Sequence, residues 1–523
     1  MSDQPRSVPD HPSLRYLKIE AKRRLAAGEF SALHEAQLAI AREHGMPSWA
    51  ALKASIGAGQ DGQAGQEAQA GQEGQAGQEG QAVPQIRWVT SRFSDADDPA
   101  WTPPAVSELR EHFADSFLDR IPPGKLVPLL VRRIAGVRED LVVTTDSPHM
   151  TRARVAGLQV HAAVEGQPPH RLIGLRLEPV GSRVTDDRVG SPPTIAVGEV
   201  PAPVAGIAAA AFAEFGLVGL VLAGGEPRAE PGGSVWAAAT GWADLDRAEI
   251  LTSARAFPAS KITMLITSTA VLRLIADDRV GLDDPVNRHL RTVRLADDTV
   301  TVGEVLTHAG GLDGSSTSFT DRVRDLDALF GPVVHGNGER GVARTGDAGY
   351  GVLGQMIADV TGQAYPDAAR RLVLDPLGMT DSWFPDRWPG RDRNAITGYR
   401  LADGAFVPAP ERIAAIQAAA GLWATATDLV RFALGWSSLL PGELAAEALR
   451  PQVTRLPAPG HSGFGWLINS DRGVAGMAGL GLGASASLVV GLDRGDVNVA
   501  LANRRVTIES VNGQVRRSIT AED

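Results

Sequence analysis

The chain has 523 residues, a formal net charge of −10 and no cysteine. This length allows two to four domains with at least one large hydrophobic core. The acidic balance argues against a dedicated nucleic-acid-binding protein, whose binding face is normally basic. A chain without cysteine has no disulfides, no catalytic thiolate and no cysteine-ligated metal.

The first residues, Met1–Asp10, are polar and lack the apolar core of a signal peptide, so we expect a cytoplasmic protein. The most apolar stretch, Val204–Gly224, is interrupted by Glu214 and by glycines. It therefore predicts a helix followed by a buried strand, and neither a membrane span nor a membrane partner is expected.

Residues 12–56 show apolar residues at helical spacing and predict a small helical module, marked by Leu14, Leu17, Ala21 and Leu25 and by Leu33, Ala36, Ile40 and Ala41. The phrase Leu33–Leu52 resembles an ankyrin-like accessory segment. We interpret it as a docking or solubility module through which a protein partner would bind. Residues 57–82 repeat Gly, Gln, Glu and Ala, contain nothing apolar larger than alanine, and predict a flexible linker.

Residues 84–180 predict a small α+β domain. The spacing of apolar residues from Val106 to Leu118 indicates one amphipathic helix, and Pro122 and Pro123 begin a second. Three strands are expected at Asp140–Thr145, Arg152–Val164 and Arg171–Glu178. The arrangement resembles an NTF2/steroid-isomerase-like domain.

Residues 200–510 contain sequence blocks in a fixed order: Gly241–Asp246, Phe257–Val286, Val305–Leu312, Gly349–Gly354, Asp375–Phe384, Ala420–Phe432, and a final strand pair at Ser487–Gly491 and Val497–Asn503. Together they resemble the serine β-lactamase and penicillin-binding-protein family, in its class C β-lactamase and esterase branch. The resemblance implies an α+β fold, with an antiparallel sheet flanked by helices, a helical lobe, and an active site between them.

The first catalytic motif of that family is Ser-x-x-Lys at the start of a helix, in which the serine attacks a carbonyl and the lysine assists proton transfer. Alignment without gaps places Lys261 at the serine position and Met264 at the lysine position. An ammonium group is not a hydroxyl nucleophile, and a thioether does not accept that proton. Lys261 is also the only lysine after Lys125, which indicates placement for a function; the alternative is a genome that favours arginine codons.

The second motif, Tyr-x-Asn, falls on Thr345 and Asp347 when counted back from Tyr350. The alternative is that Thr345–Asp347 is only a turn, with Asp347 as the N-cap of the next helix. The third motif, His- or Lys-x-Gly, falls on Met477-Ala478-Gly479. A literal match at Gly460–Gly463 comes one strand too early, and we expect its His461 to lie in a loop.

If the family geometry holds, Lys261, Asp347 and Thr345 converge as catalytic groups, beside a substrate-binding surface formed by Met264, Met477, Ala478 and Gly479. No cofactor and no metal are expected. The leading hypothesis is a repurposed pocket for a small acidic or carbonyl-bearing molecule, either a ligand binder or a non-hydrolytic biosynthetic enzyme of isomerase, cyclase or lyase type. The alternatives are an active hydrolase, esterase or transacylase that uses Ser260, and a catalytically dead scaffold.

Overall fold

The computed structural model describes residues 39–40 and 81–520, except 99, 120, 138–140, 148–149, 156–157, 166, 180–185, 191–192, 228–233, 313–318, 391–393, 403 and 455–459. The chain divides into two compact units, 1–80 and 81–523. The predicted helical module at 12–56 and the linker at 57–82 therefore lie almost wholly outside the described residues. Their organisation stays a prediction.

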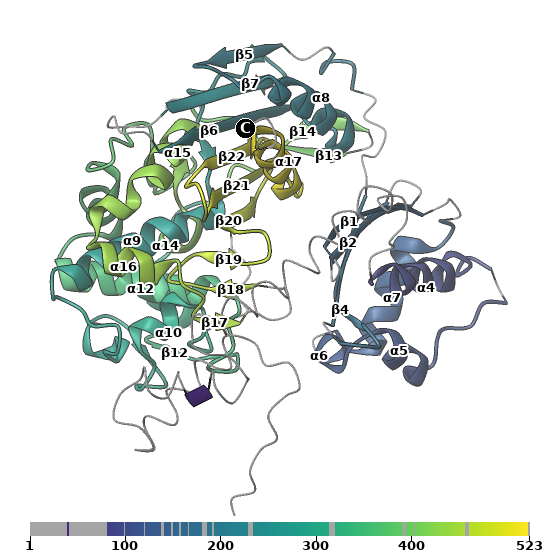
Figure 1. Ribbon diagram of the computed structural model, residues 1–523, viewed down its shortest axis with the longest axis horizontal. Coiled ribbons are helices and arrows are strands. Elements are labelled where there is room, and N and C mark those ends of the chain that lie inside the picture. Colours follow the sequence, from purple (N-terminus) through teal and green to yellow (C-terminus); the bar gives the residue numbers. More distant parts are fainter. Residues whose placement is uncertain are drawn as a thin grey trace, which may run out of the picture. The chain divides into compact units, whose positions relative to one another are not determined.

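The region from 83 to 179 combines four helices with a four-stranded antiparallel sheet of order β1-β2-β3-β4 (Figure 1). Its core forms where apolar residues of the helices meet the sheet, as with Phe93, Leu130 and Val160. The elements are α4 (Val83–Ser94), α5 (Val106–His112), α6 (Asp115–Leu118), α7 (Pro123–Ile134), β1 (Val142–Ser147), β2 (Met150–Val155), β3 (Leu158–Val164) and β4 (Leu172–Pro179).

Two predictions for this region are corrected. The single helix expected from Val106 to Leu118 is broken, because Phe113 is extended and forms a bridge with Leu172. The single strand expected at Arg152–Val164 is a hairpin of β2 and β3. The helix predicted to begin at Pro122–Pro123 is confirmed as α7, whereas the NTF2-like relationship stays a prediction.

The larger region is built on a ten-stranded sheet in which all paired neighbours are antiparallel. Along the sheet the order is β17 (Val453–Thr454), β18 (His461–Ser462), β19 (Leu467–Asn469), β20 (Val474–Gly481), β21 (Ala484–Gly491), β22 (Val497–Ala502), β6 (Gly219–Glu226), β7 (Ser234–Asp244) and β5 (Thr194–Val197), and β8 (Glu249–Ile250) also pairs with β7.

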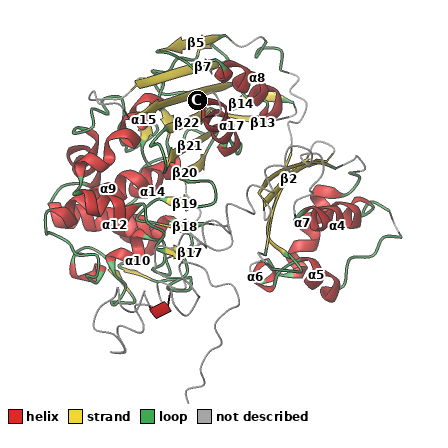
Figure 2. Ribbon diagram, in the orientation of Figure 1, coloured by secondary structure: helices red, strands yellow, loops and turns green. Residues whose placement is uncertain are grey.

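Helices cover both faces of this sheet, as Figure 2 shows. In β6, Leu220 and Leu222 pack with α8 (Pro203–Phe215) and α17 (Glu509–Thr520), while Val221 and Ala223 face the main core on the other side. Successive side chains of a strand point to opposite faces, so a strand covered on both sides is apolar throughout. The helix and buried strand predicted within Val204–Gly224 are thus confirmed as α8 and β6.

The main core continues into the helical lobe, whose longest helices are α9 (Thr263–Ala276), α12 (Asp347–Thr361) and α15 (Ala426–Gly435). Shorter helices complete it: α10 (Val302–Leu306), α11 (Leu326–Phe330), α13 (Tyr365–Ala369), α14 (Gln417–Ala420), α16 (Gly442–Ala448), the π-helical turn η3 (Arg370–Leu374), and the 3-10 turns η2 (Val286–Arg288) and η4 (Trp436–Leu439). Small two-stranded ladders pair β10 (Arg294–Leu295) with β12 (Val333–Val334), β11 (Phe319–Thr320) with β15 (Ile413–Ala414), and β13 (Tyr399–Ala402) with β14 (Ala405–Pro408). The predicted antiparallel sheet with flanking helices and a helical lobe is confirmed.

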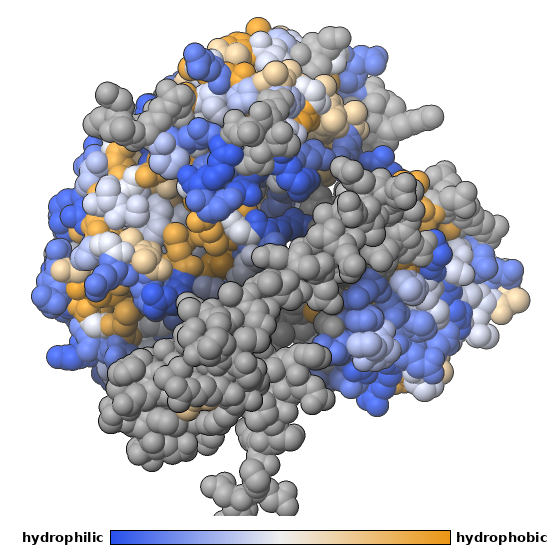
Figure 3. All heavy atoms as spheres, viewed as in Figure 1, coloured by the Kyte–Doolittle hydropathy of each residue, from blue (hydrophilic) through white to orange (hydrophobic). Residues whose placement is uncertain are grey.

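On the face drawn in Figure 3, the apolar surface residues form separate patches with hydrophilic residues between them. Within the described residues, no helix is both long enough and apolar enough to cross a membrane. The expected cytoplasmic location stays a prediction.

Candidate functional site

The segment that carries Lys261 is a tight strand-to-helix turn. β9 (Phe257–Pro258) pairs with β16 (Trp423–Ala424), and the 3-10 turn η1 (Ser260–Ile262) then leads into α9. Ser260 has φ of +48°, a left-handed conformation that is uncommon outside glycine and is often found at functional sites. The Thr263 hydroxyl fixes the turn by donating a 2.6 Å hydrogen bond to the carbonyl of Ser260.

The structure brings Lys261 and Asp347 into direct contact. Lys261 Nζ donates a 2.6 Å hydrogen bond to Asp347 Oδ1. The lysine side chain is 24% exposed and the aspartate side chain 1%, so a molecule arriving from solvent meets the lysine side chain rather than the carboxylate. Asp347 is the first residue of α12, and the N-cap is Gly346, so the alternative that made Asp347 the N-cap is wrong. Its carboxylate accepts the hydrogen bond from Lys261 instead. The carboxylate also lies at a helix N-terminus, where negative charge is favoured.

Gly479 on β20 lies directly against this turn. A Cβ atom at that position would lie 2.5 Å from Ser260 Oγ and 2.6 Å from Lys261 N, closer than side chains pack. Only a glycine therefore allows the strand to approach so closely. Met477 and Gly479 share the buried face of β20, whereas Ala478 lies on the opposite face because side chains alternate along a strand. The side chain of Ala478 is thus not brought to the turn.

The two methionines of the predicted substrate-binding surface are part of the core. Met264 is 0% exposed and Met477 is 3% exposed, and both belong to the main hydrophobic cluster. Contact of either one with a ligand stays a prediction. The expectation that His461 lies in a loop is corrected, because it forms β18 within the main sheet.

Two hydroxyl groups next to the ion pair in sequence are buried without a hydrogen-bond partner among the described residues: Ser260 Oγ and Thr345 Oγ1. Buried polar atoms in native proteins almost always have partners, so each such atom needs an explanation, such as a bound water or a ligand. Ser260 lines a narrow cavity of about 20 Å³, which is room for about one water molecule.

The other walls of this cavity were not predicted from the sequence, and they include Phe319, Trp388, Arg412 and Trp423. Trp423 was visible within the Ala420–Phe432 block, but the other three lie outside the recognised blocks, and their approach to Ser260 depends on the folded chain. Arg412 is a half-exposed cation at this cavity, with Asp321 3.5 Å away.

Tyr350 does not supply the phenol that is missing at position 345. Its hydroxyl donates to the backbone carbonyl of Leu306 at 3.0 Å, and its side chain is fully buried. Burial raises the pKa of Tyr350 far above the ordinary value, so it is a poor proton donor. Within the described part of the chain, no cluster of three or more histidine and acidic side chains is arranged to hold a metal ion.

Comparisons with known proteins agree with this architecture. The Beta-lactamase family model matches residues 216–519, which is more than half of the chain. The chain belongs to the β-lactamase family. Among curated relatives, Esterase EstB of Burkholderia gladioli is 30% identical over 289 residues, which cover 46% of this chain and 73% of the esterase.

A second curated relative, Penicillin-binding protein 4 of Amycolatopsis lactamdurans, is 29% identical over 196 residues, covering 35% of this chain. The chain spans about half (51%) of that protein's length. Among solved structures, a penicillin-binding protein homologue from Pyrococcus abyssi matches with a TM-score of 0.54 at 19% identity, covering 61% of this chain and 77% of the other. A class C β-lactamase from Rhodobacter sphaeroides matches with a TM-score of 0.51 at 18% identity, covering 61% of this chain and 100% of the other. At these identities the structural matches establish the fold alone.

Proposed function

We propose that this β-lactamase-family protein binds a small acidic or carbonyl-bearing molecule at Lys261 and does not hydrolyse it by Ser-x-x-Lys chemistry. The observation that carries the proposal is the ion pair at the position where the family resemblance expects the nucleophile. The ammonium group of a partly exposed lysine side chain is held 2.6 Å from a carboxylate that is itself buried. Lys261 is therefore the member of the pair that a ligand can reach from solvent.

The chemistry available to Lys261 follows from its hydrogen bonds. An ammonium group has three donors, and one of them is engaged by Asp347. The others have no acceptor among the described residues, so they can bind a carboxylate or polarise a carbonyl oxygen. Imine formation needs Nζ to reach a carbonyl carbon, whereas Nζ is held 2.6 Å from Asp347 Oδ1. The arrangement therefore favours ligand binding or proton donation, as in an isomerase, cyclase or lyase, over covalent catalysis by the lysine.

The two unpartnered hydroxyls give the proposed ligand further polar contacts. Ser260 is adjacent to Lys261, and Thr345 precedes Asp347 by two residues. A ligand oxygen placed between them and Nζ would satisfy groups that are otherwise buried without partners. A catalytically dead scaffold would have no use for two unsatisfied hydroxyls that neighbour, in sequence, the two members of this ion pair.

Hydrolysis by Ser260 is the second candidate, because curated relatives include an esterase and a penicillin-binding protein. A nucleophilic serine needs a base within hydrogen-bond reach. No described side chain is hydrogen-bonded to Ser260 Oγ, and Lys261 Nζ bonds to Asp347 instead.

A labelling experiment separates the two candidates. The protein is incubated with a fluorescent penicillin and, separately, with p-nitrophenyl acetate, and the products are followed by mass spectrometry and absorbance. We expect neither a stable adduct nor a burst of nitrophenol. An adduct mapped to Ser260 and abolished by Ser260→Ala would overturn the proposal.

A binding experiment tests the role of Lys261. A panel of small carboxylates and 2-oxo acids is compared with the matching amides by isothermal titration calorimetry. We expect at least one acid to bind and the binding to be lost in Lys261→Met, while Lys125→Met, which removes an exposed lysine from the smaller domain, changes nothing. If no acid binds and Lys261→Met alters only stability, the pair is structural and the scaffold alternative is correct. Neighbouring genes for biosynthetic enzymes would guide the choice of acids.

A further inference from the structure

A cavity much larger than the one at Ser260 lies away from Lys261. It has a volume of about 510 Å³, within the range of small-molecule sites, and lies between residues 254–256, the α13–η3 segment and residues 379–384. Neither Ser260 nor Lys261 lines it. Backbone hydrogen bonds nevertheless link its wall to the narrow cavity at Ser260. Trp383 lines the larger cavity and exchanges two backbone hydrogen bonds of 2.9 Å with Trp423, which lines the narrow one.

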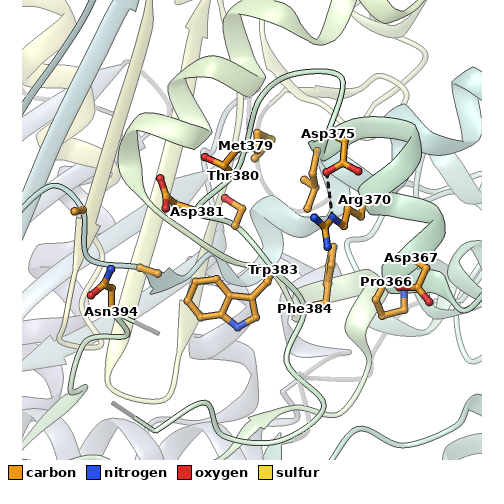
Figure 4. A pocket seen from close by; sticks show the side chains of 14 residues that line it. Pro366, Asp367, Arg370, Asp375, Met379, Thr380, Asp381, Trp383, Phe384 and Asn394 are labelled. Carbon is orange, nitrogen blue, oxygen red and sulfur yellow. Dashed lines mark hydrogen bonds and ion pairs between the residues drawn. The ribbon is translucent and has the colours of Figure 1, made fainter. Parts of the chain in front are cut away.

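Two half-buried aromatic rings, Trp383 and Phe384, form part of this cavity. Figure 4 shows the indole of Trp383 near the middle of the view, with Asp381 on one side and Phe384 and Arg370 on the other. A flat apolar group of a ligand would stack on these rings, and a cation would be attracted to the indole face.

The charged lining is predominantly negative. Asp367, Asp375 and Asp381 contribute three carboxylates, and Arg370 contributes one guanidinium. Arg370 Nε lies 3.1 Å from Asp375 and largely cancels it. Within the part of the chain that the structure describes, Asp367 and Asp381 make no ion pair, so two uncompensated carboxylates lie at a cavity that contains an indole.

The backbone of the cavity wall is itself unusual. η3 (Arg370–Leu374) is a π-helical turn, closed by a 2.9 Å hydrogen bond from Asp375 N to Arg370 O. Such turns are rare and are found frequently at functional sites. Here the wider turn lies between the two aspartates Asp367 and Asp375 that line the cavity.

From the cavity volume, the aromatic rings and the excess of carboxylates, we propose that this is a second ligand site, which accepts a small organic cation with a flat apolar body. The ammonium group of the ligand would lie by Asp381 and its apolar body on Trp383, while Asp367, on the other side of the cavity in Figure 4, adds to the negative potential. The site is distinct from the one proposed at Lys261, whose ligand carries the opposite charge.

The test uses three probes of similar shape: 2-phenylethylamine as the cation, 2-phenylethanol as the neutral analogue and 3-phenylpropionate as the anion. Binding to the full-length protein is measured by calorimetry and by ligand-observed NMR. We expect the amine to bind at least about tenfold more tightly than the alcohol, and only the amine to weaken as salt screens the exposed carboxylates. Equal binding of amine and alcohol, preference for the acid, or no amine binding at millimolar concentration would each overturn the proposal.

Variants place the binding in the cavity. Asp381→Asn and Asp367→Asn should each weaken the amine about two- to fivefold without changing the alcohol, and Trp383→Leu should weaken both. Asp386→Asn, which changes an exposed aspartate outside the lining, and Lys261→Met should leave amine binding unchanged. Should Trp383→Leu fail to fold, the isosteric aspartate variants still decide the question. Equal loss of amine binding in Asp386→Asn would show attraction to general negative charge and contradict a built site.

Discussion

Two buried aspartates in the first turns of helices have very different surroundings. Asp428, in α15, accepts hydrogen bonds from Asp381 N at 2.9 Å, from Ser382 Oγ at 2.8 Å and from Arg431 at 2.7 Å. Asp347, in α12, is hydrogen-bonded to the side chain of Lys261, which lies 86 positions away and reaches solvent. Asp428 is thus held by several groups that tie neighbouring loops together, whereas Asp347 holds a single group in place.

The difference suggests how a structural carboxylate can be told from one that positions a reactive group. A structural carboxylate is saturated by backbone and short side chains, so removing it exposes several unsatisfied donors. A positioning carboxylate accepts hydrogen bonds from one partner only and leaves that partner accessible to a ligand. The predictions that follow test whether Asp347 and Asp428 differ in this way.

The largest effect is expected from Asp428→Ala. The change leaves the Ser382 hydroxyl and the Asp381 amide without their acceptor, and buried unsatisfied groups each cost about 1–3 kcal/mol. We expect the free energy of unfolding to fall by roughly 3 kcal/mol, measured by urea denaturation. Asp428→Asn keeps an acceptor oxygen and serves as the control, with a smaller loss. If Asp428→Ala is as stable as the wild type, Asp428 is not a structural carboxylate and the contrast with Asp347 fails.

Lys261→Met should have the next largest effect on stability. It leaves the carboxylate of Asp347 buried without its cation, and breaking a buried pair costs about 3–5 kcal/mol. Because the lysine side chain is partly exposed, we expect a smaller loss of about 2 kcal/mol in the free energy of unfolding.

The double variant Lys261→Met/Asp347→Asn completes a double-mutant cycle, and it should recover most of that loss because the uncompensated charge is gone. If the two single changes are additive, the pair contributes nothing in solution, and both the comparison and the proposed ligand site fail.

The sequence predicted the architecture of the large domain better than the chemistry of its site. Blocks such as Asp375–Phe384 and Ala420–Phe432 consist of residues that are neighbours in the sequence, so the packing that they specify can be recognised from short segments. The convergence of Lys261 with Asp347 could be anticipated only through the family resemblance, because it depends on how α9 and α12 pack. Phe319 and Arg412 at Ser260, and the burial of Met264 and Met477, depend on tertiary contacts that no local pattern encodes.

A pH titration tests the surroundings of Asp428, with an effect of intermediate size. Burial raises the pKa of Asp428 above its ordinary value despite its hydrogen bonds. In the window between the unfolded value near 4 and the higher folded value, the folded state therefore binds more protons than the unfolded state. The contribution of Asp428 to stability thus increases as the pH falls through that window.

We therefore expect the wild type to gain stability relative to Asp428→Asn when the pH is lowered from 7 towards 4, as measured by urea denaturation at each pH. Other carboxylates that lose stabilising contacts in acid are common to both proteins and cancel in the difference. A difference that shrinks on acidification would mean that Asp428 is not held in a raised-pKa state.

The smallest effects should come from the threonines near the two aspartates, Thr345 and Thr425. Thr425 Oγ1 accepts a 3.2 Å hydrogen bond from Asp428 N and caps α15, so Thr425→Val should lower the free energy of unfolding by about 1 kcal/mol. Thr345 Oγ1 is buried without a partner among the described residues, so Thr345→Val removes an unsatisfied group at nearly constant shape.

The free energy of unfolding of Thr345→Val should stay within about 0.5 kcal/mol of wild type or rise, while binding of the acid at Lys261 weakens. The decisive measurement is the pair of urea midpoints together with calorimetry on the same two variants. A loss of stability in Thr345→Val as large as that in Thr425→Val would mean that the Thr345 hydroxyl already has a partner in the folded protein, such as an ordered water. That hydroxyl would then not be available to a ligand, and the proposed site would consist of the ammonium of Lys261 and the hydroxyl of Ser260 alone.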